Sequence, residues 1–164
     1  MLCRINQIIM TTGSPAQAQP IIRPMDEADL AAALRLWGKT DGVEVAEGDS
    51  AAELALYLLR NPGASQVATQ DGVLIGAVLA GHDGRRGLIY HLAVAPGHRG
   101  RFIGRSLVSK SLAALKLQGI RRALILVASD NPGGRNFWER SGWQIMNFAH
   151  TLGIDLSERD SSPN

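Results

Sequence analysis

One stretch of the chain, residues 91–107, combines the residue types and the spacing that a small anionic ligand needs. An apolar segment from His91 to Val94 ends at Pro96-Gly97, and a short basic loop and a helical pattern follow it. This order predicts a strand that leads into the N-terminus of a helix. There the first backbone N–H groups lack intrahelical partners and the helix dipole favours an anion.

The side chains of the basic loop strengthen this prediction. Arg99, Arg101 and Arg105 supply positive charge, and Gly100 and Gly104 allow the backbone to come close to a ligand. Together they predict a cradle for a phosphate or a diphosphate. A nucleotide-binding P-loop is the less favoured interpretation, because the loop lacks the Gly-Lys-Ser/Thr ending of such loops.

Composition limits the classes of partner. The 164 residues are 45% hydrophobic, which suits one compact domain, and 17 Lys+Arg nearly balance 15 Asp+Glu, which disfavours a nonspecific nucleic-acid binder. No apolar run approaches the length of a membrane span, so no membrane partner is expected. The single cysteine, Cys3, excludes an internal disulfide, gives no metal-binding spacing and favours a reducing, cytoplasmic compartment.

The ends of the chain differ in composition from its middle. Residues 1–19 are expected to form a disordered leader, residues 20–154 the folded domain and residues 155–164 a polar tail. Ala16-Gln17-Ala18 resembles a signal-peptide cleavage site, but the apolar stretch before it is too short for an export signal.

The elements that must position the basic loop follow from hydrophobic periodicity and turn signals. A two-residue hairpin is expected at Asp71-Gly72, and Ser50 or Asp49 is expected to cap the second helix. The segment 123–128 follows the loop helix, so a right-handed crossover would make it parallel to the strand at 88–94. Strands are expected at residues 21–24, 66–69, 73–80, 88–94, 123–128 and 143–152, and helices at residues 26–39, 50–61, 104–118 and 135–140.

The basic loop resembles the acetyl-CoA-binding motif of the GNAT family of N-acetyltransferases, Arg/Gln-x-x-Gly-x-Gly/Ala. The corresponding residues here run from Arg99 to Gly104, with Phe102 in place of the first motif glycine. The resemblance implies that the loop binds the diphosphate of acetyl-coenzyme A. It also implies that the strand ending at Val94 holds the pantetheine arm through main-chain hydrogen bonds.

A second resemblance lies about thirty residues further on. GNAT proteins commonly show an asparagine, a small residue, a tyrosine and a Gly-Phe pair at fixed spacing, and the matching residues here are Asn131, Gly134, Trp138, Gly142 and Trp143. Together the two resemblances span residues 21–152. They imply cofactor-binding roles for Leu92, Ala93, Val94, Arg99, Gly100, Arg101, Phe102, Ile103, Gly104, Arg105, Asn131 and Trp138.

The implied fold is of the α/β (α+β) class, the acyl-CoA N-acyltransferase fold. It has a mixed, mostly antiparallel sheet that is splayed between the fourth and fifth strands and flanked by helices. The chain is similar to small bacterial acetyltransferases related to those that modify the N-termini of ribosomal proteins. Related folds often pair through their last strands, so a homodimer is one alternative, and the oligomeric state is left open.

The implied activity is transfer of an acetyl group from acetyl-CoA to a primary amine, with no metal. The acceptor, a small molecule or a peptide, is left unidentified. The alternative is a non-catalytic, coenzyme-binding or regulatory module, because Phe102, Trp138 and Leu126 stand where many relatives have a glycine, a tyrosine acid and a carboxylate base.

Those departures leave Tyr90 and His91 as the candidate catalytic residues. An imidazole can take up a proton near neutral pH, and both residues belong to the strand that leads into the loop. Because successive strand residues point to opposite faces, at most one of them is expected to face the substrate. The alternatives are a structural histidine, simple aromatic packing for the tyrosine, and a chain of water molecules as the base.

Two further features bear on the ligands. The loop at residues 40–49 carries Asp41, Glu44 and Glu47, which could attract a cationic amine or could simply be solvated. If the motif glycine adopts a backbone conformation that bulky residues avoid, Phe102 strains the basic loop by about 1–3 kcal/mol. Coenzyme A would then bind with reduced affinity.

Overall fold

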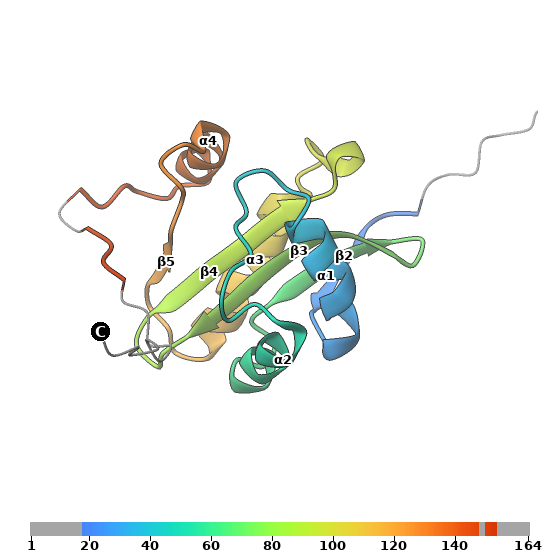
Figure 1. Cartoon of the computed structure of the whole chain (residues 1–164), viewed down its shortest axis with the longest axis horizontal. Helices are drawn as coiled ribbons and strands as arrows, with labels where there is room; N and C mark the ends of the chain where they lie inside the picture. The colour runs from blue at the N-terminus through green and yellow to red at the C-terminus, as the bar shows by residue number, and fades with distance from the viewer. Residues whose placement is uncertain (1–17, 148–149, 154–164) are drawn as a thin grey trace, which may run out of the picture.

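A five-stranded sheet forms the centre of the molecule (Figure 1). The computed structural model describes residues 18–147 and 150–153. The strands lie in chain order, the first four antiparallel and the fifth parallel to the fourth. They are β1 (Ile21–Pro24), β2 (Gln66–Gln70), β3 (Val73–His82), β4 (Gly87–Val94) and β5 (Ala123–Ile125).

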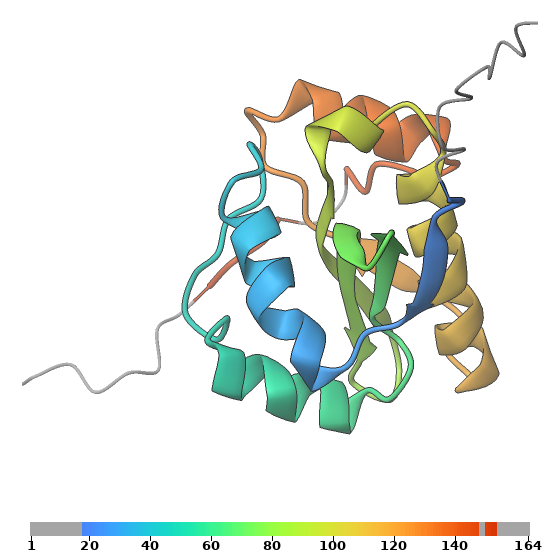
Figure 2. The same ribbon diagram turned by 90° about the vertical axis from the view of Figure 1, so that its right-hand side faces the viewer.

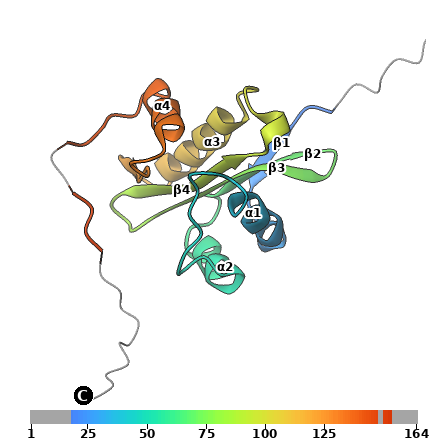
Figure 3. The same ribbon diagram turned by 45° about the horizontal axis from the view of Figure 1, so that its top comes forward.

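Helices cover both faces of this sheet. Helices α1 and α2 lie on one face and α3 lies on the other, as Figures 2 and 3 show. Two of the helical segments begin at a capping box: Ser50 and Glu53 form one at α2, and Asp26 and Asp29 form another at η1, which runs into α1. The bounds are η1 (Glu27–Asp29), α1 (Leu30–Trp37), α2 (Ala51–Arg60), η2 (Pro96–His98), α3 (Ile103–Leu117) and α4 (Pro132–Arg140).

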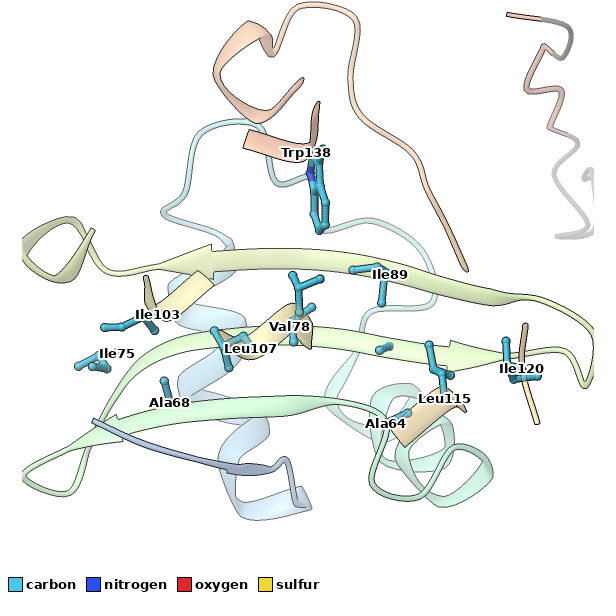
Figure 4. Close-up of a cluster of buried hydrophobic side chains, with 12 residues drawn as sticks. Ala64, Ala68, Ile75, Val78, Ile89, Ile103, Leu107, Leu115, Ile120 and Trp138 are labelled. Carbon is cyan, nitrogen blue, oxygen red and sulfur yellow. The ribbon is translucent and has the colours of Figure 1, made fainter. Parts of the chain in front are cut away.

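The sheet divides the hydrophobic core in two. On the α3 side, Val78 and Ile89 from the strands pack with Leu107 from α3, and Trp138 reaches the same cluster from α4 (Figure 4). On the other side, Trp37 and Leu54 from the two covering helices pack with further strand residues. Each face of the sheet therefore has its own apolar layer.

Strands β4 and β5 part after a short pairing. The register joins Gly87 to Ala123, Leu88 to Leu124 and Ile89 to Ile125. Beyond Ile89 no strand of the described chain lies on that side of β4, although β4 continues to Val94. The expected splay and the expected parallel pairing are both confirmed, and β5 leads away toward α4 (Figure 1).

A β-bulge interrupts β4 at the same level. Ala77 stands opposite Ala93 and Leu79 stands opposite Tyr90, so β4 has one extra residue between these pairs, and His91 has a φ of 47°. The extra residue breaks the alternation of side chains along the strand. Tyr90 and His91 both line one cavity, as do Leu92, Ala93 and Val94 after them.

The expected last strand at 143–152 is absent from the described residues of that range, and β5 ends three residues earlier than expected. A strand needs a hydrogen-bonded neighbour, and beyond Ile125 the chain has left β4, with Leu126 63% exposed. Trp143 instead packs against Trp138, with ring centroids 5.0 Å apart. The described residues of this segment are thus irregular chain, joined to α4 through Trp143.

The expected domain boundaries fall largely outside the described residues. The leader lies outside them except for Ala18 and Gln19, and the tail at 155–164 lies wholly outside them. The carbonyl oxygen of Ala18 accepts a hydrogen bond of 2.8 Å from Gln70 Nε2. The described chain is therefore attached to β2 from Ala18 onward.

Candidate active site

An open cavity of about 2130 Å³ lies where β4 and β5 part. Its walls are β4, the N-terminal end of α3, helix α4 and the loop at residues 40–49. Small-molecule sites commonly occupy about 300–1,000 Å³, so this cavity has room for two substrates. All the cofactor-binding residues expected from the sequence line it except Arg101, and both candidate catalytic residues line it as well.

The N-terminus of α3 is the polar end of this cavity. Its N-cap residue, Phe102, provides no side-chain cap, and the first intrahelical hydrogen bond recorded there runs from the Ser106 N–H to the Phe102 carbonyl. By contrast, side chains cap the N-termini of α2 and α4. The first turn of α3 therefore presents unpaired N–H groups beside Arg99 and Arg105, an arrangement that suits an anion.

Phe102 has the backbone conformation that its motif position suggested. Its φ of 61° and ψ of 5° place it in the left-handed region, and its side chain is 70% exposed. The guanidinium carbon of Arg105 lies 5.7 Å from the centre of its ring. An L-residue in this region costs about 1–2 kcal/mol, so the loop carries strain that glycine would not have.

Replacing Phe102 with glycine should therefore stabilise the fold. The gain is expected to be about 1 kcal/mol, since relief of strain exceeds the entropic cost of glycine. If the strain at residue 102 opposes the loop conformation that binds the ligand, coenzyme A should bind the glycine variant up to about fivefold more tightly. Urea denaturation and titration calorimetry measure the two effects.

Phe102→Ala is the matched control, because alanine removes the ring and keeps the cost of the left-handed backbone. Equal gains for the alanine and glycine variants would show that the ring obstructs the ligand and that strain plays no part.

The parted edge of β4 also offers hydrogen-bonding groups. The Ala95 N–H donates to the Ile75 carbonyl on β3, 2.8 Å away, and strand residues turn their peptide groups to alternate edges. The peptide groups of Leu92 and Val94 consequently face the gap. The Val94 carbonyl accepts a 2.9 Å hydrogen bond from Arg99 Nε, which leaves the Val94 N–H as a donor there.

His91 is held against an acidic partner from a distant part of the sequence. Its Nε2 lies 2.9 Å from Asp49 Oδ1, and each of the two side chains is 13% exposed. The ring also packs against that of Trp37, with centroids 5.1 Å apart. Sequence reasoning missed this role of Asp49, because the residue stands next to Ser50 and both can cap a helix.

Two tyrosines border the same part of the cavity. The rings of Tyr57 and Tyr90 meet edge to face at 6.5 Å, and the Tyr90 and His91 rings lie 6.1 Å apart. Burial raises the pKa of both tyrosines, and the nearby charge of Asp49 raises the pKa of Tyr90 further. Both hydroxyls are therefore protonated at neutral pH and can act as hydrogen-bond donors.

Asn131 and Trp138, expected to contact the cofactor, also shape the cavity wall. Asn131 Oδ1 accepts a 2.8 Å hydrogen bond from the Gly134 N–H and thereby caps α4, while Nδ2 lies 3.5 Å from the Gly42 carbonyl. Trp138 is buried, with the Phe137 ring centroid 5.1 Å away. Asn131 thus joins α4 to the loop at 40–49, and Trp138 provides an apolar surface.

The acidic residues of that loop belong to the cavity wall, and the loop joins α1 to α2 on the sheet face opposite α3 (Figure 3). Asp41, Glu44 and Glu47 all line the cavity. Among the residues that the structure describes, no cluster of three or more histidine, cysteine or carboxylate side chains could hold a metal ion. Within the same ranges, no helix is both long enough and apolar enough to span a membrane.

A splayed sheet whose gap meets an uncapped, arginine-flanked helix defines an acyl-CoA-dependent acyltransferase. Residues 30–143 match the Acetyltransferase (GNAT) family, and the chain belongs to that family. It is 30% identical over 137 residues to an acetyltransferase of Pectobacterium atrosepticum, covering 84% of this chain and 96% of that protein.

Solved structures agree on the fold. The PaiA N-acetyltransferase from Thermoplasma acidophilum, in complex with coenzyme A, superposes with a TM-score of 0.69 at 18% identity, over 80% of this chain and 94% of that one. The ribosomal-protein-S18-alanine N-acetyltransferase from Escherichia coli gives a TM-score of 0.62 at 18% identity, over 76% and 77%. The expected fold and family are confirmed, and the protein is an N-acetyltransferase that uses acetyl-CoA as its acetyl donor.

Proposed function

We propose that this enzyme acetylates a primary amine on an acceptor that carries further positive charge. The observation that supports this acceptor class is the polarity of the cavity. Arg99, Arg105 and the bare N-terminus of α3 line one end, on the α3 face of the sheet, and the acidic loop at 40–49, which joins α1 to α2, lines the other (Figure 3). The first end suits the anionic donor and the second suits a cationic acceptor.

Donor binding is assigned to the α3 end of the cavity. The N–H groups of the first turn of α3, together with Arg99 and Arg105, would hold the diphosphate. The peptide groups of Leu92 and Val94 would hold the pantetheine amides and the thioester carbonyl. Arg101 is exposed and does not line the cavity, so its contribution is reduced to attraction at long range.

Acetyl transfer requires that the acceptor ammonium lose a proton, that its nitrogen attack the thioester carbonyl and that a thiolate leave. The Val94 N–H is the donor for the carbonyl oxygen as negative charge develops on it. His91 is the base for the ammonium proton, and the Tyr90 hydroxyl, kept protonated by its raised pKa, is the proton donor for the thiolate. Tyr90 takes the part that many relatives give to the tyrosine replaced here by Trp138.

Release of free thiol from acetyl-CoA in the presence of different amines tests this proposal. Spermidine, kanamycin and a short peptide with an N-terminal alanine and two lysines are compared with butylamine, which has no second charge. At least one polycation should be acetylated with a kcat/KM ten or more times that of butylamine, since a single favourable charge interaction of about 1.4 kcal/mol gives that factor.

The catalytic assignment is tested on the best of these acceptors. His91→Gln should lower kcat about 10²-fold, the lower end of what general base catalysis contributes, with the KM for acetyl-CoA unchanged. Full activity of the variant would contradict the role of His91. Equal use of butylamine and the polycations would contradict the acceptor class.

Location and assembly remain proposals as well. The lone cysteine, Cys3, supports a cytoplasmic enzyme. A homodimer built on the last strands is less well supported, because the described residues of 143–152 form no strand. Sedimentation at micromolar concentration distinguishes a monomer from a dimer.

A further inference from the structure

We infer that Asp49 is a positioning residue for His91. The geometry points to an imidazole that donates its Nε2–H to the Asp49 carboxylate and presents Nδ1 to the acceptor amine. The inference rests on the proposed function, in which His91 takes the ammonium proton, and it specifies which nitrogen does so and what keeps that nitrogen unprotonated.

The Asp49 carboxylate is itself fixed in place. Its Oδ2 accepts a 3.0 Å hydrogen bond from the Ala46 N–H, while Oδ1 faces His91 Nε2 at 2.9 Å. One oxygen thus closes the turn of the loop and the other is available to the imidazole. A carboxylate accepts hydrogen bonds and does not donate them, so the Nε2 that faces it must carry the proton.

The surroundings of the ring leave Nδ1 as the free nitrogen. Trp37 from α1 packs against the imidazole, Asp49 from the loop meets Nε2, and Tyr90 lies beside it on β4. Nδ1 makes no hydrogen bond to any residue that the structure describes, and His91 lines the cavity. The bulge in β4 gives His91 a positive φ and turns its ring toward Asp49 and the cavity. A positive φ is unfavourable for this residue, so it persists only where surrounding contacts enforce it.

The acceptor ammonium loses two protons during acetyl transfer, and a different group takes up each of them. An N–H bond of the acceptor ammonium breaks, its proton goes to Nδ1, and the nitrogen keeps the electron pair. That pair forms a bond to the thioester carbonyl carbon, and the C–S bond breaks with its electrons on sulfur. The Tyr90 hydroxyl gives its proton to the sulfur and takes up the second proton of the nitrogen, so the products are a neutral amide and a free thiol. The imidazolium now carries a proton on each ring nitrogen, and its charge faces the Asp49 carboxylate until solvent removes a proton. An uncharged amide could accept the Nε2–H bond but could not offset this charge.

Asp49→Asn tests the inference, with Asp71→Asn as the control. Asp71 lies exposed in the β2–β3 turn, so its variant has the same change of charge far from the cavity. With spermidine or whichever amine of the panel reacts best, Asp49→Asn should lower kcat at least about tenfold, a part of the general-base contribution. The KM for acetyl-CoA should stay unchanged, and Asp71→Asn should behave as the wild type.

A spectroscopic readout is independent of turnover. In protein labelled with ¹⁵N-histidine, at a pH where imidazoles are neutral, the His91 signals should show a protonated Nε2 and an unprotonated Nδ1. His91→Gln assigns these signals by their loss, and Asp49→Asn should mix the two tautomers. A protonated Nδ1 in the wild-type protein would overturn the inference. This test needs only the wild-type protein, so it holds even if the Asp49 variant fails to fold.

The two proposals fail in different ways. If Asp49→Asn keeps the wild-type kcat while His91→Gln loses activity, the positioning role is wrong and the role of His91 as base stands. If His91→Gln keeps full activity while the wild type shows the Nε2–H tautomer, the assignment of the base fails and the hydrogen bond stands as a structural contact.

Discussion

Gly104→Glu is expected to weaken binding of coenzyme A about 10³-fold while leaving the fold intact. A Cβ atom at this position would meet the Phe137 ring at 3.6 Å and Val94 Cγ2 at 3.7 Å, both ordinary contacts, so a side chain fits and projects into the cavity. The new carboxylate lies at the end of the cavity assigned to the diphosphate. Two like charges about 4 Å apart near a protein surface repel by about 4 kcal/mol, which corresponds to that factor.

Titration calorimetry with coenzyme A measures this effect, and thermal unfolding checks the fold. Ser109→Glu is the charge-matched control, because Ser109 is exposed on the same helix, beyond the first turn. It should bind coenzyme A as tightly as the wild type. Unchanged binding by Gly104→Glu in a folded protein would place the diphosphate elsewhere and would remove the basis for the donor end of the cavity.

Trp37→Ala is expected to lower the free energy of unfolding by about 3–5 kcal/mol, the usual cost of emptying a buried tryptophan site. Trp37 is fully buried in the core layer beneath α1 and α2. Its ring also supports His91, so the folded fraction of the variant should have a reduced kcat at an unchanged KM for acetyl-CoA. Urea denaturation followed by circular dichroism gives the stability.

Trp37→Phe separates packing from polar interactions. The indole Nε1 is buried and has no hydrogen-bond partner among the described residues, so phenylalanine leaves nothing newly unpaired. A loss of about 1–2 kcal/mol is expected for the smaller cavity. A loss as large as that of alanine would reveal a role for the indole nitrogen that packing does not explain.

The sequence was informative wherever the signal is local. Several predicted features depend only on residues that are close together in the chain, and the structure contains each of them. They are the Asp71-Gly72 hairpin, the cap at Ser50, and the strand, basic loop and helix from 91 to 117. The parallel β5 followed from the handedness of crossovers. The spacing of the two motifs then indicated the family. The family in turn implied that the fourth and fifth strands splay apart, which the parallel pairing by itself only suggested.

The parts that could not be predicted depend on contacts between distant residues. Asp49 and His91 are 42 positions apart, and they meet because of a bulge that no glycine or proline marks in the sequence. The apolar pattern at 143–152 suits a strand, yet the chain there has no strand to pair with in the described residues. Whether a segment forms a strand, and which side chains pair, depends on a second segment of the chain. The local sequence pattern holds no information about that second segment.

Strand β5 is hydrogen-bonded to β4 at three register positions and lies at the edge of the sheet. Segments with so few backbone bonds open at the lowest free energy, so amide protons of β5 and α4 are expected to exchange long before those of the central strand β3. The wall that loosens first is also the wall that closes one side of the cavity. A long, flexible product such as coenzyme A can thus leave through local opening of β5 and α4 while β1–β4 stay folded.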